Sequence, residues 1–178
     1  MKVVFWDLET TNLSALMGRI LCCSFVELDG EPWTFRQDDP DFTGETLTDD
    51  SNLCLAIREE LETYDLIVAH NGRLFDIPLL NARLAKAGLG PLKTHFMLDT
   101  RWYLNSASMR IGSAKLENAA KFFQLGEQKT AISWDVWQRA AALEKDAMDG
   151  VVEHCEADVK VLRELYPIVL PYVSTLHR

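Results

Sequence analysis

Residues 5–12 read FWDLETTN and directly follow Val3 and Val4, so a short apolar run leads straight into two carboxylates. The run is β-branched and aromatic, which is typical of a buried strand. Because side chains alternate along a strand, Asp7 and Glu9 are predicted to point to the same face of a sheet. Two such carboxylates repel each other unless a positive partner compensates them. A divalent cation such as Mg²⁺ or Mn²⁺ suits carboxylate oxygens, although an isolated D-x-E triplet equally fits an edge strand whose acids face water.

The composition is that of a globular chain of 178 residues, enough for a single domain over residues 1–178 with a sizeable core. The formal net charge of −9 argues against a strongly basic nucleic-acid coat, but it suits an enzyme whose acids hold metal ions. No apolar run is long enough to span a bilayer, and the first residues do not resemble a signal peptide. The four cysteines lack zinc-ligand spacing, so we expect reduced thiols in a cytoplasmic protein.

The first three strands are predicted to form an antiparallel meander. Residues 19–28 are a second apolar run, Asp29 and Gly30 give a hairpin-turn signal, and residues 31–36 return as a third strand. The acidic, turn-rich stretch 37–50 is expected to be a surface loop.

Two helix–strand units are predicted to follow the meander. Asp50 or Ser51 suits the N-cap of the first helix and Asp76 that of the second, with Pro78 in its first turn. A strand that follows a helix is expected to run parallel to the first strand. The predicted elements are helix 51–63, strand 66–69, helix 76–87 and strand 95–98.

The remainder of the chain is predicted to be helical with loops. Trp134 and Trp137 lie three residues apart and are expected to pack in the core rather than to stack on bases. The last strong helix is predicted over residues 151–170, with Gly150 interrupting the segment before it and Pro171 ending it.

That last helix places His154 and Asp158 on one face, one turn apart. A neutral imidazole can take a proton from water, although an isolated histidine on a helix is more often a solvated residue. Carboxylates are therefore predicted near an apolar scaffold on the first strand, before the helix at residue 76, and on the last helix.

Three motifs in this order resemble the DEDD (DnaQ-like) 3′→5′ exonuclease family of the ribonuclease H-like superfamily. They are FWDLETT at residues 5–11, HNGRLFD at residues 70–76 and HCEAD at residues 154–158. The resemblance implies an α/β fold, a ribonuclease H-like mixed sheet in which an antiparallel three-strand meander joins parallel strands flanked by helices. It also implies metal-dependent hydrolysis at the 3′ end of single-stranded nucleic acid, with DNA favoured, releasing nucleoside monophosphates.

The resemblance further implies two divalent metal ions, Mg²⁺ or Mn²⁺, held by Asp7, Glu9, Asp76 and Asp158. By analogy Asp7 bridges both ions, Glu9 and Asp158 complete one of them, and Asp76 acts through water. His154 is then the general base and the fifth catalytic residue. In this family the base is usually a tyrosine four residues before the last aspartate or a histidine five before it. This chain carries a histidine at the tyrosine spacing, which leaves its subfamily open.

Substrate contacts are expected from the first two motifs. Residues of the first motif would contact the 3′ end largely through their backbone, and those of the second would hold the terminal nucleotide or cap a turn. These candidates are Leu8, Thr10, Thr11, Asn71 and Phe75. Asp99 follows a strand and is either a support for the site or a helix cap. Candidates for a phosphate-binding strip are Arg73, Arg101, Arg110, Lys115, Lys121 and Lys129, although a charge run is usually a solvated face.

Two alternatives remain open: a ribonuclease H-like endonuclease or resolvase, and a non-catalytic nucleic-acid-binding or polymerase-accessory subunit. The intact carboxylates and candidate base favour chemistry. Because the chain stops soon after the third motif, no fused polymerase domain is expected, and a polymerase or replication protein is a candidate partner. No membrane contact is expected, and the sequence leaves the oligomeric state undetermined.

Overall fold

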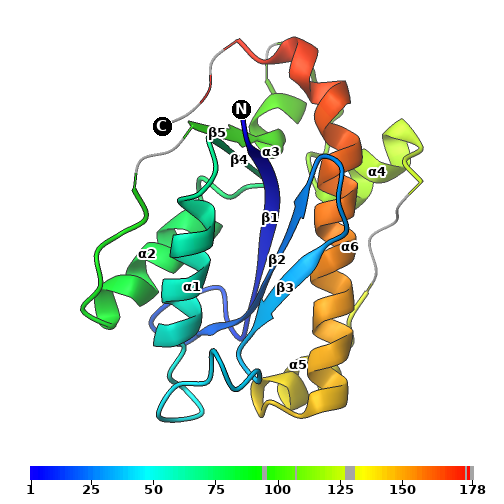
Figure 1. Cartoon of the computed structure of the whole chain (residues 1–178). Coiled ribbons are helices and arrows are strands. Elements are labelled where there is room, and N and C mark those ends of the chain that lie inside the picture. The colour runs from blue at the N-terminus through cyan, green and yellow to red at the C-terminus, as the bar shows by residue number, and fades with distance from the viewer. Residues whose placement is uncertain (94–95, 107, 127–130, 175, 177–178) are drawn as a thin grey trace.

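The computed structural model describes residues 1–178 apart from 94–95, 107, 127–130, 175 and 177–178. Within the described residues the chain forms a five-stranded mixed sheet with the strand order β3-β2-β1-β4-β5 (Figure 1). Strands β1 to β3 are antiparallel, and β4 and β5 run parallel to β1, which confirms the predicted fold class. The strands are β1 (Val3–Thr10), β2 (Ile20–Glu27), β3 (Trp33–Arg36), β4 (Leu66–Ala69) and β5 (Phe96–Asp99).

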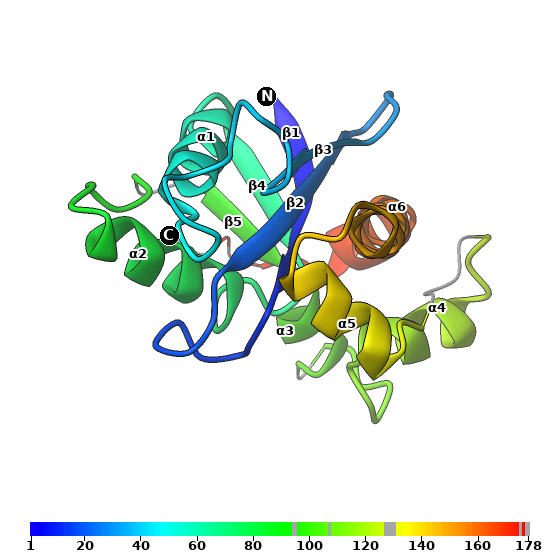
Figure 2. The same ribbon diagram turned by 90° about the horizontal axis from the view of Figure 1, so that it is seen from below.

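Helices cover both faces of this sheet. Figure 2 looks along the sheet and shows α1 and α2 on one side and α4, α5 and α6 on the other. The helices are α1 (Ser51–Leu61), α2 (Asp76–Lys86), α3 (Thr100–Leu104), α4 (Leu116–Phe123), α5 (Trp134–Ala141) and α6 (Lys145–Val169), followed by the 3₁₀ turn η1 (Leu170–Tyr172). Among the described residues, no helix is long and apolar enough to cross a membrane.

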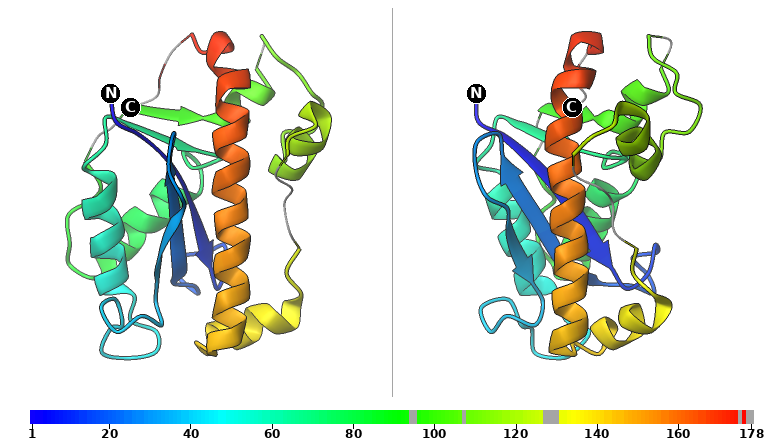
Figure 3. Two further views of the ribbon diagram at one scale, coloured as in Figure 1. Left: turned by 45° about the vertical axis from the view of Figure 1, so that its right-hand side comes forward. Right: turned by 90° about the vertical axis from the view of Figure 1, so that its right-hand side faces the viewer.

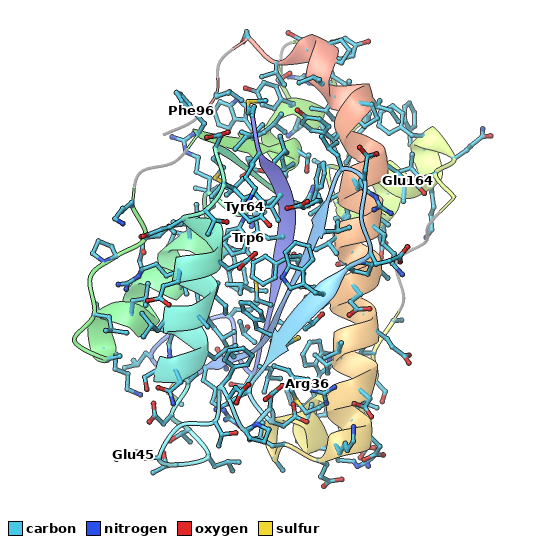
Figure 4. The ribbon with its side chains drawn as sticks, in the orientation of Figure 1. Trp6, Arg36, Glu45, Tyr64, Phe96 and Glu164 are labelled. Atoms are coloured by element: carbon cyan, nitrogen blue, oxygen red, sulfur yellow. The ribbon has the colours of Figure 1, made fainter. Side chains whose placement is uncertain are left out.

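The two faces of β1 pack against different helices. Trp6 lies fully buried on the face covered by α1 and α2, where Figure 4 shows it beside the sheet. Phe5 packs on the opposite face, in a cluster with Val159 and Leu162 of α6. Because side chains alternate along the strand, Asp7 and Glu9 follow Phe5 onto the α6 face. The prediction that these two carboxylates share a face is confirmed.

The second half of β1 extends beyond its parallel neighbour. Residues Val3–Phe5 pair with β4, whereas the pairing with β2 continues to Thr10 and contains an irregularity between Glu9 and Thr10. The turn that follows β4 and the start of α2 lie beside this extension, since Asp76 accepts a hydrogen bond from the backbone of Leu8. The carboxylates of β1 therefore lie where the parallel strands have already ended.

The long helix α6 is continuous through Gly150, so the predicted interruption is wrong. A glycine in a helix interior costs about 1 kcal/mol relative to alanine. Met148 and Val151, both fully buried, pack on either side of it, and their burial outweighs that cost. The helix also runs past Pro167 to Val169, and Pro171 lies in η1 beyond its end.

The packing prediction for the two tryptophans is confirmed for one of them. Trp137 packs partly buried against the cluster between β2 and α6. Trp134, the first residue of α5, is 72% exposed, so the prediction is wrong there. The same three-residue spacing therefore gave one packed ring and one exposed ring.

Of the two aspartates predicted as helix N-caps, Asp50 is confirmed in that position and Asp76 is not. Asp50 occupies the N-cap position of α1 but makes no side-chain capping bond. Its carboxylate instead accepts hydrogen bonds from the buried Arg83 guanidinium, at 2.6 Å from Nη2, and from the Ile20 amide at 2.8 Å. A buried guanidinium needs a carboxylate partner more than a helix needs one cap. Asp76 is the first residue of α2, and Phe75 is its N-cap.

Candidate active site

Partly buried acidic residues of β1 meet buried polar residues of α6 in one cluster. The ligand atoms of Glu9, His154 and Asp158 lie within 4.8 Å of one another, and so do those of Asp7, Glu9 and Cys155. His154 Nε2 is 3.5 Å from Glu9 Oε1. Figure 3 shows α6 lying across the face of the sheet that carries these strand residues. The fold therefore brings together four of the predicted catalytic residues, from opposite ends of the chain.

The polar residues of α6 interrupt an apolar stripe. Val151, Val159 and Leu162 are fully buried and face the sheet. His154 and Asp158 lie on the same side at helical spacing and are only 6% and 3% exposed. Burying polar and charged groups in such a stripe is costly unless they have a partner. Their position is therefore that expected of functional rather than structural residues.

Asp76 is held beside this cluster from a third element. Its carboxylate accepts hydrogen bonds from the backbone of Leu8 and from its own amide, which ties α2 to the residue next to Asp7. Burial raises the pKa of Asp76 to about 7, the nearby Asp99 carboxylate acts in the same direction, and the two hydrogen bonds oppose them. Among the described residues, Asp76 is in neither group of ligand atoms that lie within 4.8 Å.

This raised pKa gives a prediction for the metal-free protein. In an unfolded chain an aspartate titrates near pH 3.9. The folded state therefore binds the extra proton, and the stability that Asp76 contributes is complete below about pH 4 and lost as the pH rises to about 7. We expect Asp76→Asn, which keeps an acceptor for the Leu8 amide, to raise the free energy of unfolding near pH 8 by at most roughly 4 kcal/mol.

The measurement is urea unfolding in the presence of a chelator at about pH 5 and about pH 8. The gain of the Asp76→Asn variant over the wild type should be larger at the higher pH. Asp29→Asn in the exposed β2–β3 hairpin serves as the matched control and should change neither value. An equal gain at both pH values would contradict this account.

The second motif forms a tight turn held by several backbone hydrogen bonds. Asn71 has a φ of 72°, and its carbonyl accepts the amides of Leu74 and Phe75. Its own amide donates to Asp99 Oδ1 at 2.9 Å, and the same oxygen accepts the Arg101 amide, which caps α3. Asp99 therefore fills both of its suggested roles. Phe75 is partly buried against the core beneath α1 and α2.

The first-motif residues expected to contact a 3′ end are also engaged within the protein. Leu8 is buried, and its backbone already bonds Asp76. Thr11 Oγ1 accepts the Arg19 amide at 3.1 Å, and Thr10 Oγ1 donates to the Asn12 carbonyl at 3.0 Å. These bonds hold the loop that follows β1. Contact of Leu8, Thr10 and Thr11 with a substrate stays a prediction.

Sequence reasoning did not assign Cys155 to the site. Its thiol lies 3.4 Å from the Asp7 carbonyl oxygen and 3.8 Å from Asp7 Oδ2. Burial raises the pKa of this thiol well above its usual value, with Cys22 and the neighbouring carboxylates adding to the effect. The thiol is therefore uncharged and lines the site beside Asp7. Its place next to His154 in the buried stripe of a helix is the signal that could have identified it.

The predicted phosphate strip is only partly assembled. Arg73, Arg101 and Lys115 line one cavity beside the second motif. Arg110 and Lys121 are not among the residues that line it. Lys129 falls outside the described residues.

The donor set of the cluster fits a divalent cation. Asp7, Glu9 and Asp158 offer carboxylate oxygens, and His154 offers an imidazole nitrogen, within the two close groups. Mg²⁺ and Mn²⁺ take oxygen ligands, and imidazole suits many transition metals. The residues present can therefore hold the kind of ion that the motif resemblance implies.

Comparison with known proteins agrees with this architecture. The family model RNase_H_2, described as RNase H superfamily, matches residues 4–170. Among solved structures, the chain is similar to the family B DNA polymerase from the hyperthermophilic archaeon Pyrobaculum calidifontis, with a TM-score of 0.74 and 16% sequence identity. The match covers 97% of this chain but 25% of that polymerase, so it corresponds to a quarter of the polymerase's length, and at this identity it shows the fold alone. The comparison with curated protein sequences gave no match.

Proposed function

Because the chain belongs to the ribonuclease H superfamily, we propose that it is a metal-dependent 3′→5′ exonuclease acting on single-stranded nucleic acid, with DNA favoured. The observation that carries the proposal is the cluster in which the partly buried Asp7 and Glu9 of β1 meet the buried His154 and Asp158 of α6. A purely structural scaffold gains little from burying several acids together, whereas a phosphodiester hydrolase needs them. One similar solved structure is a DNA polymerase, and a polymerase or replication protein is the partner we propose.

Two divalent ions, Mg²⁺ or Mn²⁺, are the proposed cofactors. Asp7, Glu9 and Asp158 would hold them. Asp76, held through its bond to Leu8, would support one of them from α2. When bound, such ions stabilise the negative charge on the attacking and leaving oxygens of a phosphodiester.

His154 is the proposed general base. Its imidazole takes the proton of the attacking water, and a neutral ring is required for this step. Glu9 Oε1, 3.5 Å from Nε2, orients the ring and stabilises the imidazolium that forms. The buried Cys155 thiol stays neutral beside Asp7 and does not compete for the proton.

An enzyme that binds the 3′ end of its substrate can act only on a strand with a free 3′ end. We expect the protein with Mn²⁺ to shorten a linear 5′-labelled single strand stepwise from its 3′ end and to leave a circular strand of the same sequence intact. The measurement is a time course on denaturing gels, with matched DNA and RNA strands. Asp7→Asn on both substrates is the control for a contaminating nuclease.

Each rival function has its own outcome in this experiment. Cleavage of the circle at a comparable rate would identify an endonuclease and contradict the proposal. Retarded migration of either strand with the protein on a native gel, with no cleavage on the denaturing gel, would identify a binding or polymerase-accessory subunit.

A further inference from the structure

We propose that a cavity beside the candidate active site binds the nucleotides that precede the 3′ end of a single strand. This inference deepens the proposed function and rests on it. The cavity has a volume of about 720 Å³, within the range of small-ligand sites. It lies between the turn of the second motif, α3, the loop before α4, and the η1 turn. The lining residues that carry the argument are Asn71, Arg73, Arg101, Trp102, Lys115 and Tyr172.

The charge of this cavity opposes that of the whole chain. The chain carries a formal charge of −9, yet Arg73, Arg101 and Lys115 all line the cavity and all are exposed. Asp99 is the acid among the described lining residues. Its carboxylate is turned to the backbone, where it accepts the amides of Asn71, Arg73 and Arg101. The cations therefore outnumber the acid, as a site for a phosphate backbone requires.

Two aromatic rings stand in the same cavity. Trp102 is 55% exposed and Tyr172 is 45% exposed, although large aromatic side chains are usually buried. The Arg73 guanidinium lies over the Trp102 ring, 5.5 Å from its centre. Exposed rings interleaved with cations are the surface on which unpaired bases stack while the backbone is neutralised. Double-stranded substrates hide the base faces that such rings need, so the occupant is a single strand.

Two sets of partly buried hydrogen bonds connect the cavity to the active site. Asp99 holds the turn that leads from Asn71 to Asp76. His70, in the same turn, donates from Nε2 to the Ala114 carbonyl at 2.8 Å, next to Lys115, and its Nδ1 lies 2.8 Å from Thr100 Oγ1. The cationic loop and the motif that carries Asp76 therefore move together. A strand seated in the cavity would lie at a constant position relative to the proposed metal ligands.

Binding can be tested without catalysis. We would measure the fluorescence anisotropy of a 5′-labelled single strand of about 12 nucleotides in the presence of a chelator, so that no cleavage occurs. Trp102→Ala should weaken binding roughly 5- to 100-fold, the usual effect of losing one base–aromatic stack, and Trp102→Phe should restore most of it. Lys115→Ala should lower the slope of log affinity against log salt concentration by about 0.7.

Two matched controls lie elsewhere on the surface. Trp134 on α5 is even more exposed than Trp102, and Lys145 begins α6 at the end of the helix opposite to η1 (Figure 1). Trp134→Ala and Lys145→Ala should bind like the wild type. A thermal melt of each variant checks that it is folded.

The outcomes separate this inference from the proposed function. If Trp102→Ala and Lys115→Ala bind like the wild type, or if the wild type binds no strand, the inference is overturned even where hydrolysis is observed. If binding depends on both residues but the protein with Mn²⁺ cuts nothing, the cavity stands as a single-strand site and the exonuclease proposal fails. If both hold, Trp102→Ala should raise KM for hydrolysis by more than it lowers kcat.

Discussion

Asp7→Asn is expected to abolish phosphodiester hydrolysis, with a loss of ~10³-fold or more in rate, because stabilisation by bound metal is worth several kcal/mol. The ligand atoms of Asp7, Glu9 and Cys155 lie within 4.8 Å of one another. Asp7 lies on the part of β1 that extends past β4. Asparagine keeps the size of the side chain and one oxygen. It lacks the negative charge that strengthens the binding of a hard divalent cation to a carboxylate.

The same substitution is expected to stabilise the metal-free protein. The Asp7 carboxylate lies close to that of Glu9, which in turn lies close to that of Asp158, and removing the Asp7 charge reduces the repulsion among them. Metal binding should raise the melting temperature of the wild type by mass action, and this rise should be small or absent in Asp7→Asn. Thermal melts with Mn²⁺ and with chelator, run beside the cleavage assay, measure both effects.

The control for Asp7→Asn is Asp29→Asn, which removes an exposed carboxylate from the hairpin at the other end of β2. It should retain activity and the metal-induced rise in melting temperature. A near-normal rate in Asp7→Asn, or cleavage by the wild type in the presence of chelator, would show that the cluster does not hold the catalytic metal.

The strand that carries the first motif was predictable because its signal is local. The apolar run from Val3 to Trp6 indicates a buried strand, and because side chains alternate along a strand, Asp7 and Glu9 emerge on one face. The spacing of His154 and Asp158 likewise determines a helix face. The three-motif resemblance supplied what local pattern could not, namely that these two faces meet. The structure confirms the meeting through a Glu9–His154 separation of 3.5 Å.

Helix caps were less predictable, because the same local sequence pattern is compatible with more than one role for an aspartate. An aspartate before an apolar periodic segment can cap the helix or pair with a distant cation. Asp50 pairs with Arg83, 33 residues away in the sequence, and Asp76 bonds the backbone of Leu8. Both partners are non-local. No window around either aspartate contains the residue that decides its role.

The residues that line the cavity beside the second motif could not be predicted from local sequence either. Arg73, Arg101 and Lys115 were candidates for phosphate binding, yet nothing in the sequence separated them from Arg110 and Lys121. Their selection follows from the register of β4 and β5, which places Ala69 beside Asp99 and so brings the turn after β4 next to α3. The hydrogen bond from His70 to the Ala114 carbonyl then adds the loop that carries Lys115. Strand register is a property of the fold rather than of a local pattern.

His154→Ala is expected to lower the rate of hydrolysis by ~10²-fold or more, which is the usual contribution of a general base. In the wild type the chemical rate should rise with pH as the imidazole loses its proton and then level off. The rise should be absent in His154→Ala. Single-turnover rates at saturating Mn²⁺ over a series of pH values measure both effects.

His154→Tyr provides the matched comparison. His154 lies four residues before Asp158, the spacing at which the resembled family usually has a tyrosine. A phenol placed on the same helix face can act as the base at higher pH, because its pKa is near 10. We therefore expect His154→Tyr to retain more activity than His154→Ala and to need a more alkaline solution for it.

The geometry of the cluster also allows a different role for His154, and the same variants decide between the two. Its imidazole lies within 4.8 Å of the ligand atoms of Glu9 and Asp158, so it could bind a metal ion instead of taking a proton. A metal ligand would be revealed by a higher Mn²⁺ concentration for half-maximal activity and by near-normal rates at saturating Mn²⁺. A base leaves the metal requirement unchanged and keeps the rate low at every metal concentration. If His154→Ala and His154→Tyr both run at the wild-type rate with the wild-type pH profile, neither role is correct, and the proton of the attacking water must leave by another group.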